Sequence, residues 1–221
     1  MLRIAFFAGV SALTLAACDD PRAPNEAHFT AGMRAYLARR GDLCVGKPVW
    51  PIDVSRDETR GGSRDAVQMP VLERLGLVKG TDAVADVDTE DGPVKVEVRR
   101  YTLTPEGTRY YLPRDARPGQ TPAHDFCAAK LTLDKVVGWA DPSSKVVGSH
   151  TTVEYTYRAE GAAWTRDPEA LRVFPMVARV LNGAGADRLK EGFTLTDKGW
   201  VADELLDEAP APVAKSEART P

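Results

Sequence analysis

The sequence has few residues of the kinds that build metal sites. It contains three cysteines and three histidines among 221 residues, and 7% of the chain is aromatic. The histidines lie far apart, at His28, His124 and His150, without the spacing of a zinc site. No Cys-x-x-Cys pair, Gly-x-Ser-x-Gly elbow, phosphate-binding loop or dinucleotide fingerprint occurs. The sequence therefore predicts no metal, no cofactor and no recognisable enzyme class.

The sequence also lacks a large excess of charge of either sign. The chain has 29 basic and 32 acidic residues, giving a formal net charge of −3, with 43% apolar and 28% charged residues. This is the composition of an ordinary globular protein, and it excludes a disordered chain, a polytopic membrane protein and a disulfide-dense miniprotein. The balance does not favour binding to nucleic-acid phosphates.

A single long apolar run opens the chain. Arg3 precedes apolar residues 4–17, and Cys18 follows directly. The run is too short for a transmembrane helix, which needs roughly 20 apolar residues. The ending Leu15-Ala16-Ala17-Cys18 resembles the lipobox of bacterial lipoproteins. The resemblance implies a signal peptide at 1–17, cleavage before Cys18, and lipidation of its sulfur and its new amine. An ordinary secretory signal or a buried N-terminal strand are the alternatives.

Several acyl chains on Cys18 would anchor the protein firmly without a transmembrane helix. We therefore expect a lipid-anchored cell-envelope protein whose residues 18–26 form a short polar tether. Asp19 resembles the signal that retains enterobacterial lipoproteins in the inner membrane, which favours its periplasmic face. At the other end, residues 208–221 lack apolar periodicity and predict a disordered tail.

With Cys18 lipidated, two cysteines are left. In an oxidising compartment, Cys44 and Cys127 are expected to form a disulfide that closes a loop of about 80 residues. Two buried thiols or a redox pair are the alternatives.

The first half of the chain shows the apolar spacing of a helix, followed by a segment that is similar to a known structural motif. Apolar spacing predicts a core-facing helix at about 27–40, an exposed loop at 53–66, and a short helix beginning at Pro70. Residues 69–112 resemble the recognition-helix end and wing of winged-helix proteins. The matching segments are Leu72-Glu73-Arg74-Leu75-Gly76-Leu77-Val78 and Val94-Lys95-Val96-Glu97-Val98-Arg99-Arg100-Tyr101-Thr102-Leu103-Thr104-Pro105-Glu106-Gly107.

Within the second segment, Thr104 is the expected helix N-cap and Pro105 the first helical residue. The sequence departs from the family where DNA would bind, because residues 80–93 carry five acidic residues and no basic one. We therefore expect the fold without DNA binding. The apolar pattern also changes parity between Val98 and Tyr101, which predicts a β-bulge near Arg99 and Arg100.

The second half predicts antiparallel strands and a helix. Alternating apolar residues indicate paired strands at 131–139 and 153–158, joined by a polar loop at 141–150. A helix follows, capped by Asp167 and either kinked or split at Pro175, and then a final strand near 193–200. Segments 69–112 and 174–200 show weak sequence similarity to each other. An internal duplication, or two unrelated strand-to-turn transitions, would explain it.

Together these patterns predict an α+β fold. We expect a helical, winged-helix-like lobe at 27–112, a connecting loop at 113–124 and a β-rich antiparallel lobe at 125–207. Four aromatic residues could line a binding groove or fill the second lobe's core: Trp139, Tyr155, Tyr157 and Trp164. Of these, Trp164 is expected to be the most exposed.

The function that best fits the sequence is a non-enzymatic binding or accessory module. It would act near the membrane, on another envelope protein and not on nucleic acid. An envelope enzyme with a site of dispersed carboxylates, and an inhibitor or immunity-type lipoprotein, are the alternatives.

Overall fold

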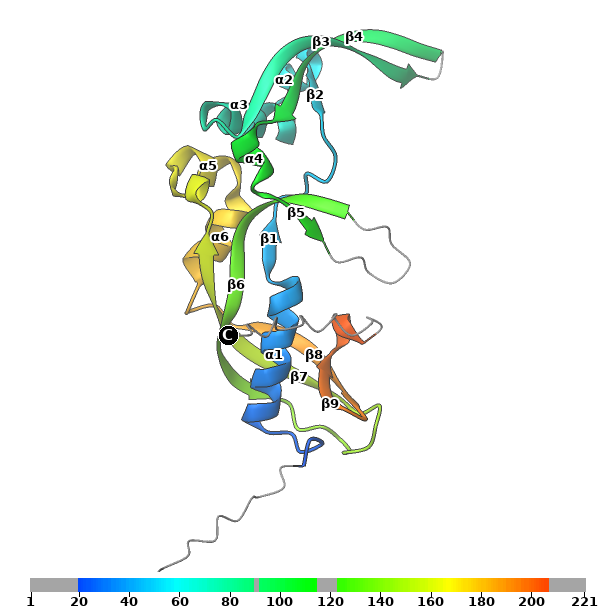
Figure 1. The fold of residues 1–221 in the computed structure, drawn as a ribbon, viewed down its shortest axis with the longest axis vertical. Helices are drawn as coiled ribbons and strands as arrows, with labels where there is room; N and C mark the ends of the chain where they lie inside the picture. The colour runs from blue at the N-terminus through cyan, green and yellow to red at the C-terminus, as the bar shows by residue number, and fades with distance from the viewer. Residues whose placement is uncertain (1–19, 90–91, 115–122, 207–221) are drawn as a thin grey trace, which may run out of the picture.

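A computed structural model describes residues 20–89, 92–114 and 123–206 of the chain (Figure 1). The predicted signal peptide, Cys18, Asp19 and the tail at 208–221 lie outside the described residues. The fold is mixed α+β with a curled antiparallel sheet, which confirms the predicted class. Within the described ranges, no helix is long and apolar enough to cross a membrane.

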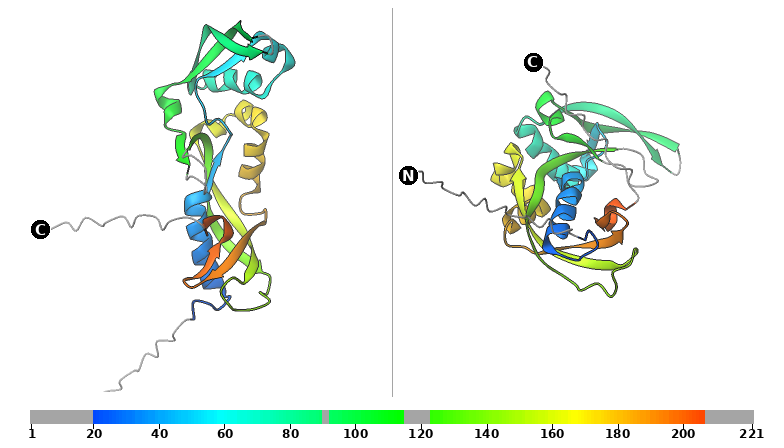
Figure 2. Two further views of the ribbon diagram at one scale, coloured as in Figure 1. Left: turned by 90° about the vertical axis from the view of Figure 1, so that its right-hand side faces the viewer. Right: turned by 60° about the horizontal axis from the view of Figure 1, so that its bottom comes forward.

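The larger sheet has the order β1-β6-β7-β8-β9, with β5 also paired to β6. Its strands are β1 (Asp42–Cys44), β5 (Tyr111–Arg114), β6 (Ala123–Trp139), β7 (His150–Gly161), β8 (Leu189–Thr196) and β9 (Gly199–Ala202). The antiparallel pairing of β6 with β7 confirms the expected strand pair in the second half of the chain. The sheet curls around helix α1 (Glu26–Arg40), as Figure 2 shows.

Helix α1 forms one side of a core against the larger sheet. Asn25 caps it through a hydrogen bond from the His28 amide, and Phe29, Met33 and Leu37 are buried at one helical spacing. The predicted helix at 27–40 is therefore confirmed. The sheet contributes these buried residues to the same core: Val136, Val153, Tyr155, Tyr157, Phe193, Leu195, Trp200 and Ala202.

A three-stranded sheet of order β2-β4-β3 lies at the other end of the molecule (Figure 1). It consists of β2 (Ile52–Ser55), β3 (Val78–Thr89) and β4 (Gly92–Leu103), with helices α2 (Arg56–Gly61), α3 (Arg64–Arg74) and α4 (Pro105–Thr108). Thr104 caps α4 with Pro105 at its first turn, as predicted.

Two local predictions for this part of the chain are wrong. The expected exposed loop at 53–66 contains β2 and α2, which begins with a Ser55–Glu58 capping box. Pro70 lies inside α3 because Ser63, seven residues before the proline, caps that helix.

A second core joins the small sheet to the first half of β6. It includes Leu72, Tyr101, Phe126 and Trp164, and also Phe174 from the segment that contains η1 (Ala163–Arg166), α5 (Pro168–Val173) and α6 (Pro175–Gly183). Of the two alternatives at Pro175, the structure has two separate helices. Because β6 contributes to both cores and α1 packs with the later strands, the two cores do not coincide with segments 27–112 and 125–207.

Segment 113–124 is not simply a connecting loop. Its ends pair as β5 and β6, with Pro113 opposite His124 and Arg114 opposite Ala123, while residues 115–122 lie outside the described part. The Tyr111 and His124 rings stack beside this pairing with centroids 5.0 Å apart. The chain therefore returns from the small sheet to the large one through a hairpin.

Candidate functional site

Strands β3 and β4 form a long hairpin that projects away from the rest of the molecule (Figures 1 and 2). Their pairing runs from Val78 opposite Leu103 to Thr89 opposite Gly92 without a shift in register. The β-bulge predicted near Arg99 and Arg100 is therefore wrong. The parity of the apolar residues changes along β4 for another reason.

The apolar residues of the hairpin change from one face to the other along its length. Near the base, Tyr101 is buried against the core, opposite Gly80. Val98 points to the opposite face, because side chains three positions apart in a strand lie on different sides. The face that carries Tyr101 is apolar at the base, whereas the other face becomes apolar from Val98 to the tip.

We call this second apolar face the hairpin surface. It consists of three directly opposed pairs, Ala83 with Val98, Ala85 with Val96, and Val87 with Val94. Opposed residues of antiparallel strands share a face, so six aliphatic side chains form one stripe. Towards the tip, Val87 is 43% exposed and Val94 is 48% exposed, whereas Ala83, Ala85 and Val96 are partly buried and Val98, at the base, is buried. An extended apolar patch of this kind on a projecting element is typical of an interaction site.

The reverse face of the hairpin is mainly charged, although it also carries Val84, which lies opposite Glu97 and is 56% exposed. Asp82 pairs with Arg99 at 3.5 Å, and Asp86 pairs with Lys95 at 3.1 Å. At the base, Arg99 also donates to Glu73 of α3 at 2.9 Å, which raises the pKa of the guanidinium and holds the hairpin to the helix. The charged residues keep this face in water, while the hairpin surface offers neither donors nor acceptors from its side chains.

A cleft of about 890 Å³ lies where the hairpin meets β2 and α2. It is lined by Val54, Arg56, Thr59, Arg60, Asp82, Ala83, Val84, Glu97, Val98 and Arg99. Arg56 of α2 bridges to Glu97 of β4 at 2.7 Å, with both side chains largely exposed. Two members of the hairpin surface, Ala83 and Val98, thus continue into a recess at its base.

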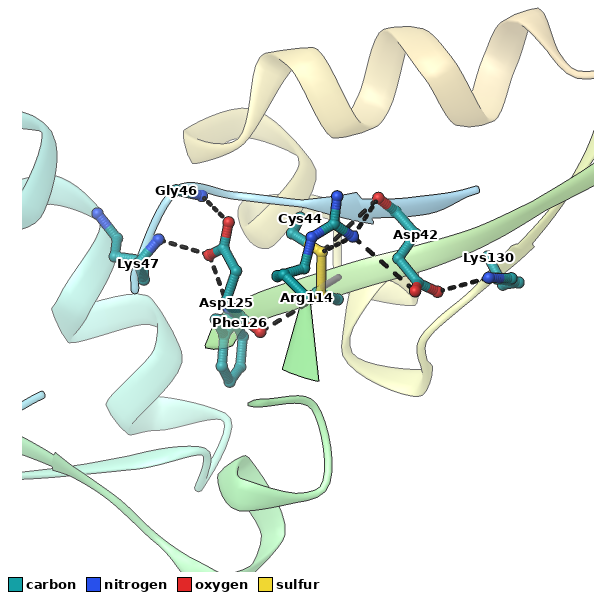
Figure 3. The surroundings of a disulfide bond; sticks show 9 residues. Asp42, Cys44, Gly46, Lys47, Arg114, Asp125, Phe126 and Lys130 are labelled. Carbon is teal, nitrogen blue, oxygen red and sulfur yellow. Dashed lines mark hydrogen bonds and ion pairs between the residues drawn. A yellow bond between two sulfur atoms is a disulfide. The ribbon is translucent and has the colours of Figure 1, made fainter. Parts of the chain in front are cut away.

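The predicted disulfide between Cys44 and Cys127 is present and joins register partners of β1 and β6. Figure 3 shows Arg114 of β5 directed at this bond, with its Nη1 3.2 Å from the Cys44 Sγ and 3.1 Å from the Asp42 carbonyl oxygen. Asp42 also forms an ion pair with Lys130 at 3.1 Å. The bridge therefore lies in a polar network that ties β1, β5 and β6 together.

On the other side of the disulfide, Asp125 holds the chain that leaves for the small sheet. Its carboxylate accepts hydrogen bonds from the amides of Gly46 at 3.2 Å, Lys47 at 2.7 Å and Phe126 at 2.7 Å (Figure 3). The Lys47 ammonium is buried and pairs with Asp65 of α3. These contacts indicate that the disulfide and its surroundings fix the junction between the two sheets.

The four aromatic residues proposed from the sequence do not line one groove. Trp164, which was expected to be exposed, is only 5% exposed. The centroid of its ring lies 5.7 Å from that of Phe126 and 5.3 Å from that of Phe174. That expectation is wrong, because the fold brings two aromatic rings onto a residue whose sequence neighbours are small or polar. Tyr155, Tyr157 and half-buried Trp139 belong to the other core.

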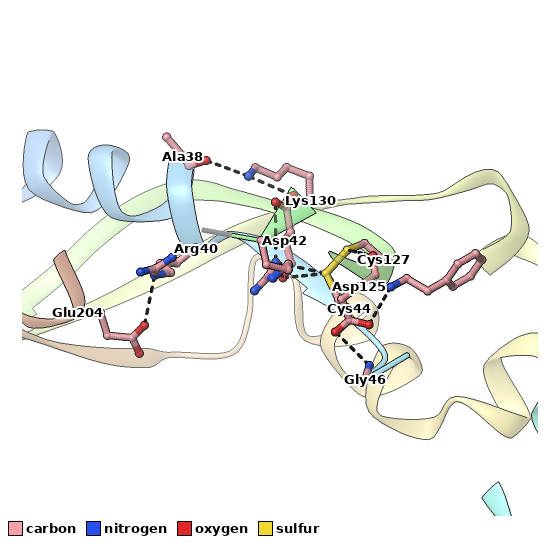
Figure 4. Close-up of polar contacts among 11 residues, drawn as sticks. Ala38, Arg40, Asp42, Cys44, Gly46, Asp125, Cys127, Lys130 and Glu204 are labelled. Atoms are coloured by element: carbon pink, nitrogen blue, oxygen red, sulfur yellow. Dashed lines mark hydrogen bonds and ion pairs between the residues drawn. A yellow bond between two sulfur atoms is a disulfide. The ribbon is translucent and has the colours of Figure 1, made fainter. Parts of the chain in front are cut away.

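A carboxyl group with a raised pKa, that of Glu191, lies between α1, β8 and η2 (Asp203–Leu205). Burial raises the pKa of Glu191 to about 7, against an opposing hydrogen bond from Tyr36, and the negative charges of Glu204 and Asp203 add to the rise. Figure 4 shows Glu204 directed at Arg40 of α1, with the two side chains 3.7 Å apart. The cleft described above does not include this cluster.

Sequence reasoning missed the hairpin surface. Its signal was present as the alternation of Ala83, Ala85 and Val87 with Asp82, Asp86 and Asp88, interrupted by Val84, which approximates the period-two pattern of a strand with one polar face. The acidic residues of segment 80–93 instead served as an argument against DNA binding.

Comparisons with known proteins leave the fold and the site to be interpreted on their own terms. No protein-family model matches the chain, and neither the search of curated proteins nor that of solved structures finds a significant match. Among the described residues, no group of three or more His, Cys, Asp or Glu side chains could hold a metal ion.

Proposed function

We propose that the protein is a lipid-anchored envelope module that binds another envelope protein through the hairpin surface. The observation that carries the proposal is the opposite placement of two features. The described chain begins at one end of the long axis, and the hairpin projects from the other end (Figure 1). Lipid on Cys18 would then hold the hairpin away from the membrane that carries the anchor.

The segment after the anchor is too short and too firmly held to change this placement. Asp20 is two residues from Cys18, a span of at most about 7 Å. The Trp200 indole donates to the Arg22 carbonyl at 3.2 Å, and the Ala23 carbonyl lies 2.8 Å from the His28 ring. The predicted tether at 18–26 thus includes residues that are attached to the body of the protein.

The chemistry of the hairpin surface favours a protein partner with an apolar patch. Six aliphatic side chains cannot recognise a sugar or a phosphate, because such ligands require hydrogen-bonding or charged groups. The acidic reverse face disfavours nucleic acid. The bilayer that holds the anchor lies at the other end of the molecule. A protein with a complementary apolar surface is therefore the occupant we propose.

The resemblance to winged-helix proteins fits this proposal as a matter of shape. Helix α3 precedes the β3–β4 hairpin, and α4 follows it from the cap at Thr104. A methyl group on Gly107 would collide with the Leu77 carbonyl, which explains the glycine of the matched segment. We propose that this unit keeps a wing-like shape and uses the wing for protein binding.

Site-specific photocrosslinking in intact cells tests the proposal. A photoreactive amino acid at Val87 or Val94 should capture the same envelope protein, while one at Asp88, on the reverse face, serves as the matched control. Palmitate labelling that is lost in Cys18→Ser tests the anchor separately. Equal crosslinking from both faces, or no adduct from either valine, would contradict the binding site.

The two alternatives predict different results. An inhibitor or immunity-type lipoprotein would yield one partner that co-purifies tightly and stoichiometrically through the hairpin. An enzyme with dispersed carboxylates is favoured by Glu191, whose pKa is raised to about 7 beside two further carboxylates. In that case Glu191→Gln would abolish the cellular function, whereas changes at Val87 and Val94 would leave it intact.

A further inference from the structure

The end of the molecule next to the proposed anchor carries a second, independent apolar feature. Residues 141–149 connect β6 to β7, and at their tip Val146 is 64% exposed and Val147 is 51% exposed. Lys145 precedes them and is exposed as well. Two adjacent exposed valines beside a lysine are the composition of a shallow membrane contact, since aliphatic groups enter the acyl boundary while the ammonium reaches lipid phosphates.

The loop presents these valines in a fixed conformation. The Ser149 amide donates to the Val146 carbonyl at 3.0 Å, and the hydroxyls of Ser144 and Ser149 are 2.6 Å apart. Gly148 has a φ of +90°, a left-handed conformation that an L side chain rarely adopts. The turn therefore points the two valines outward at little cost in conformational entropy when they meet a surface.

The loop and the start of the chain are held by the same hairpin, β8–β9. The Gly148 amide donates to the Leu195 carbonyl at 2.8 Å. Leu195 is the register partner of Trp200, whose indole holds the Arg22 carbonyl at 3.2 Å. Loop 141–149 and residues 20–23 consequently lie at one end of the molecule, as both side views of the ribbon show (Figures 1 and 2).

We infer that loop 141–149 rests on the lipid bilayer beside the anchor and inserts Val146 and Val147 into its interface. The inference rests on the proposed lipidation of Cys18, because Cys18 is four residues from Arg22, the residue whose carbonyl is held by Trp200 of β9, a span of at most about 14 Å. A lipid chain alone would let the protein tilt freely. A second contact fixes its long axis and holds the hairpin surface at a set height above the membrane.

A fluorescent probe on the full-length lipidated protein tests the orientation. Because Cys18 is lipidated and the other two cysteines are bridged, Val147→Cys introduces a single reactive thiol for an environment-sensitive nitrobenzoxadiazole label. The matched control is Val87→Cys, since that valine has similar exposure, 43% against 51%, but lies on the distant hairpin. Both proteins are reconstituted into vesicles of phosphatidylethanolamine and phosphatidylglycerol, with and without doxyl-labelled lipid.

The expected result is blue-shifted emission at position 147 that doxyl lipid quenches, with water-like, unquenched emission at position 87. Water-like emission from both positions, in protein that floats with the vesicles, would overturn the inference while leaving the anchor in place. Failure of the protein to float would overturn the anchor and the inference with it. Quenching at position 87 alone would mean that the molecule is oriented in the opposite direction.

Discussion

Removing the Cys44–Cys127 disulfide should lower the free energy of unfolding by about 4.5 kcal/mol. The two cysteines are 83 residues apart in sequence, and the chain-entropy relation for a closed loop of this length gives that magnitude. The loop contains the complete three-stranded sheet with α2, α3 and α4. For a protein of this size the loss corresponds to a fall in Tm of about 9–18 °C.

The loss should also be visible locally, at β1. This strand has only three residues, and its pairing with β6 already shows an irregularity between Leu43 and Cys44. A strand this short contributes few hydrogen bonds, so the covalent bond to Cys127 is what keeps its end in register. Without the bridge, the amides of β1 should exchange with solvent faster than those of β7, the strand on the other side of β6.

The measurement is urea unfolding followed by circular dichroism, with a Cys44→Ala, Cys127→Ala double variant. Both arms carry Cys18→Ser so that lipid does not interfere. Reduction of the parent protein should reproduce the loss, and the same reductant should leave the double variant unchanged. A loss below about 1 kcal/mol, with unaltered exchange at β1, would refute the view that the bridge holds the junction between the sheets.

Three further predictions concern the hairpin, the cores and the carboxylate cluster. Replacing residues 84–97 by Asn-Gly should change the free energy of unfolding by less than about 1 kcal/mol in the same urea assay, because among the described residues it removes no buried hydrophobic side chain and breaks only one ion pair to the rest of the protein, the exposed pair between Glu97 and Arg56. Trp164→Ala should cost about 3–5 kcal/mol, as expected for a buried aromatic residue, and an unchanged Tm would show that the ring is not in the core. Glu191→Gln should raise the Tm more at pH 8 than at pH 5. The raised pKa, about 7, means that the native state favours the protonated carboxyl, so this stabilisation is present below pH 4.5 and lost as the pH rises through 7. Equal shifts at both pH values would contradict the burial of this group.

Several features could be predicted because they depend on local chemistry. The spacing of Phe29, Met33 and Leu37 fixes one face of a helix wherever that helix packs, and an odd number of cysteines left a natural pair once Cys18 was assigned to lipid. The β6–β7 pairing followed from alternation and a short polar connection. Each of these inferences needs only residues that are neighbours in sequence or chemically unique in the chain.

The features that were missed depend on what the fold brings together. Trp164 follows two alanines and precedes a threonine, and nothing nearby in sequence announces that Phe126 and Phe174 will enclose its ring. In the same way, Pro70 looked like a helix start because the cap at Ser63 lies outside the apolar pattern. The hairpin surface was missed for a related reason. The alternation of apolar and polar residues shows that a strand has two different faces, but it does not tell which of them meets solvent.

The change of apolar face along the hairpin is the best argument that its outer half has a function. The inner half is explained by packing, because Tyr101 and Val78 cover the core beside α3. If the outer half were merely a long connection, charge on both faces would suffice and would protect its open edges from aggregation. Instead, with no shift in register to force it, all six residues of one face from Val98 to Val94 and from Ala83 to Val87 are aliphatic, while the other face carries Asp82, Asp86 and Asp88 with Val84 among them. A surface that is apolar by sequence, turned away from its own core and flanked by charge is consistent with selection for a partner outside the chain.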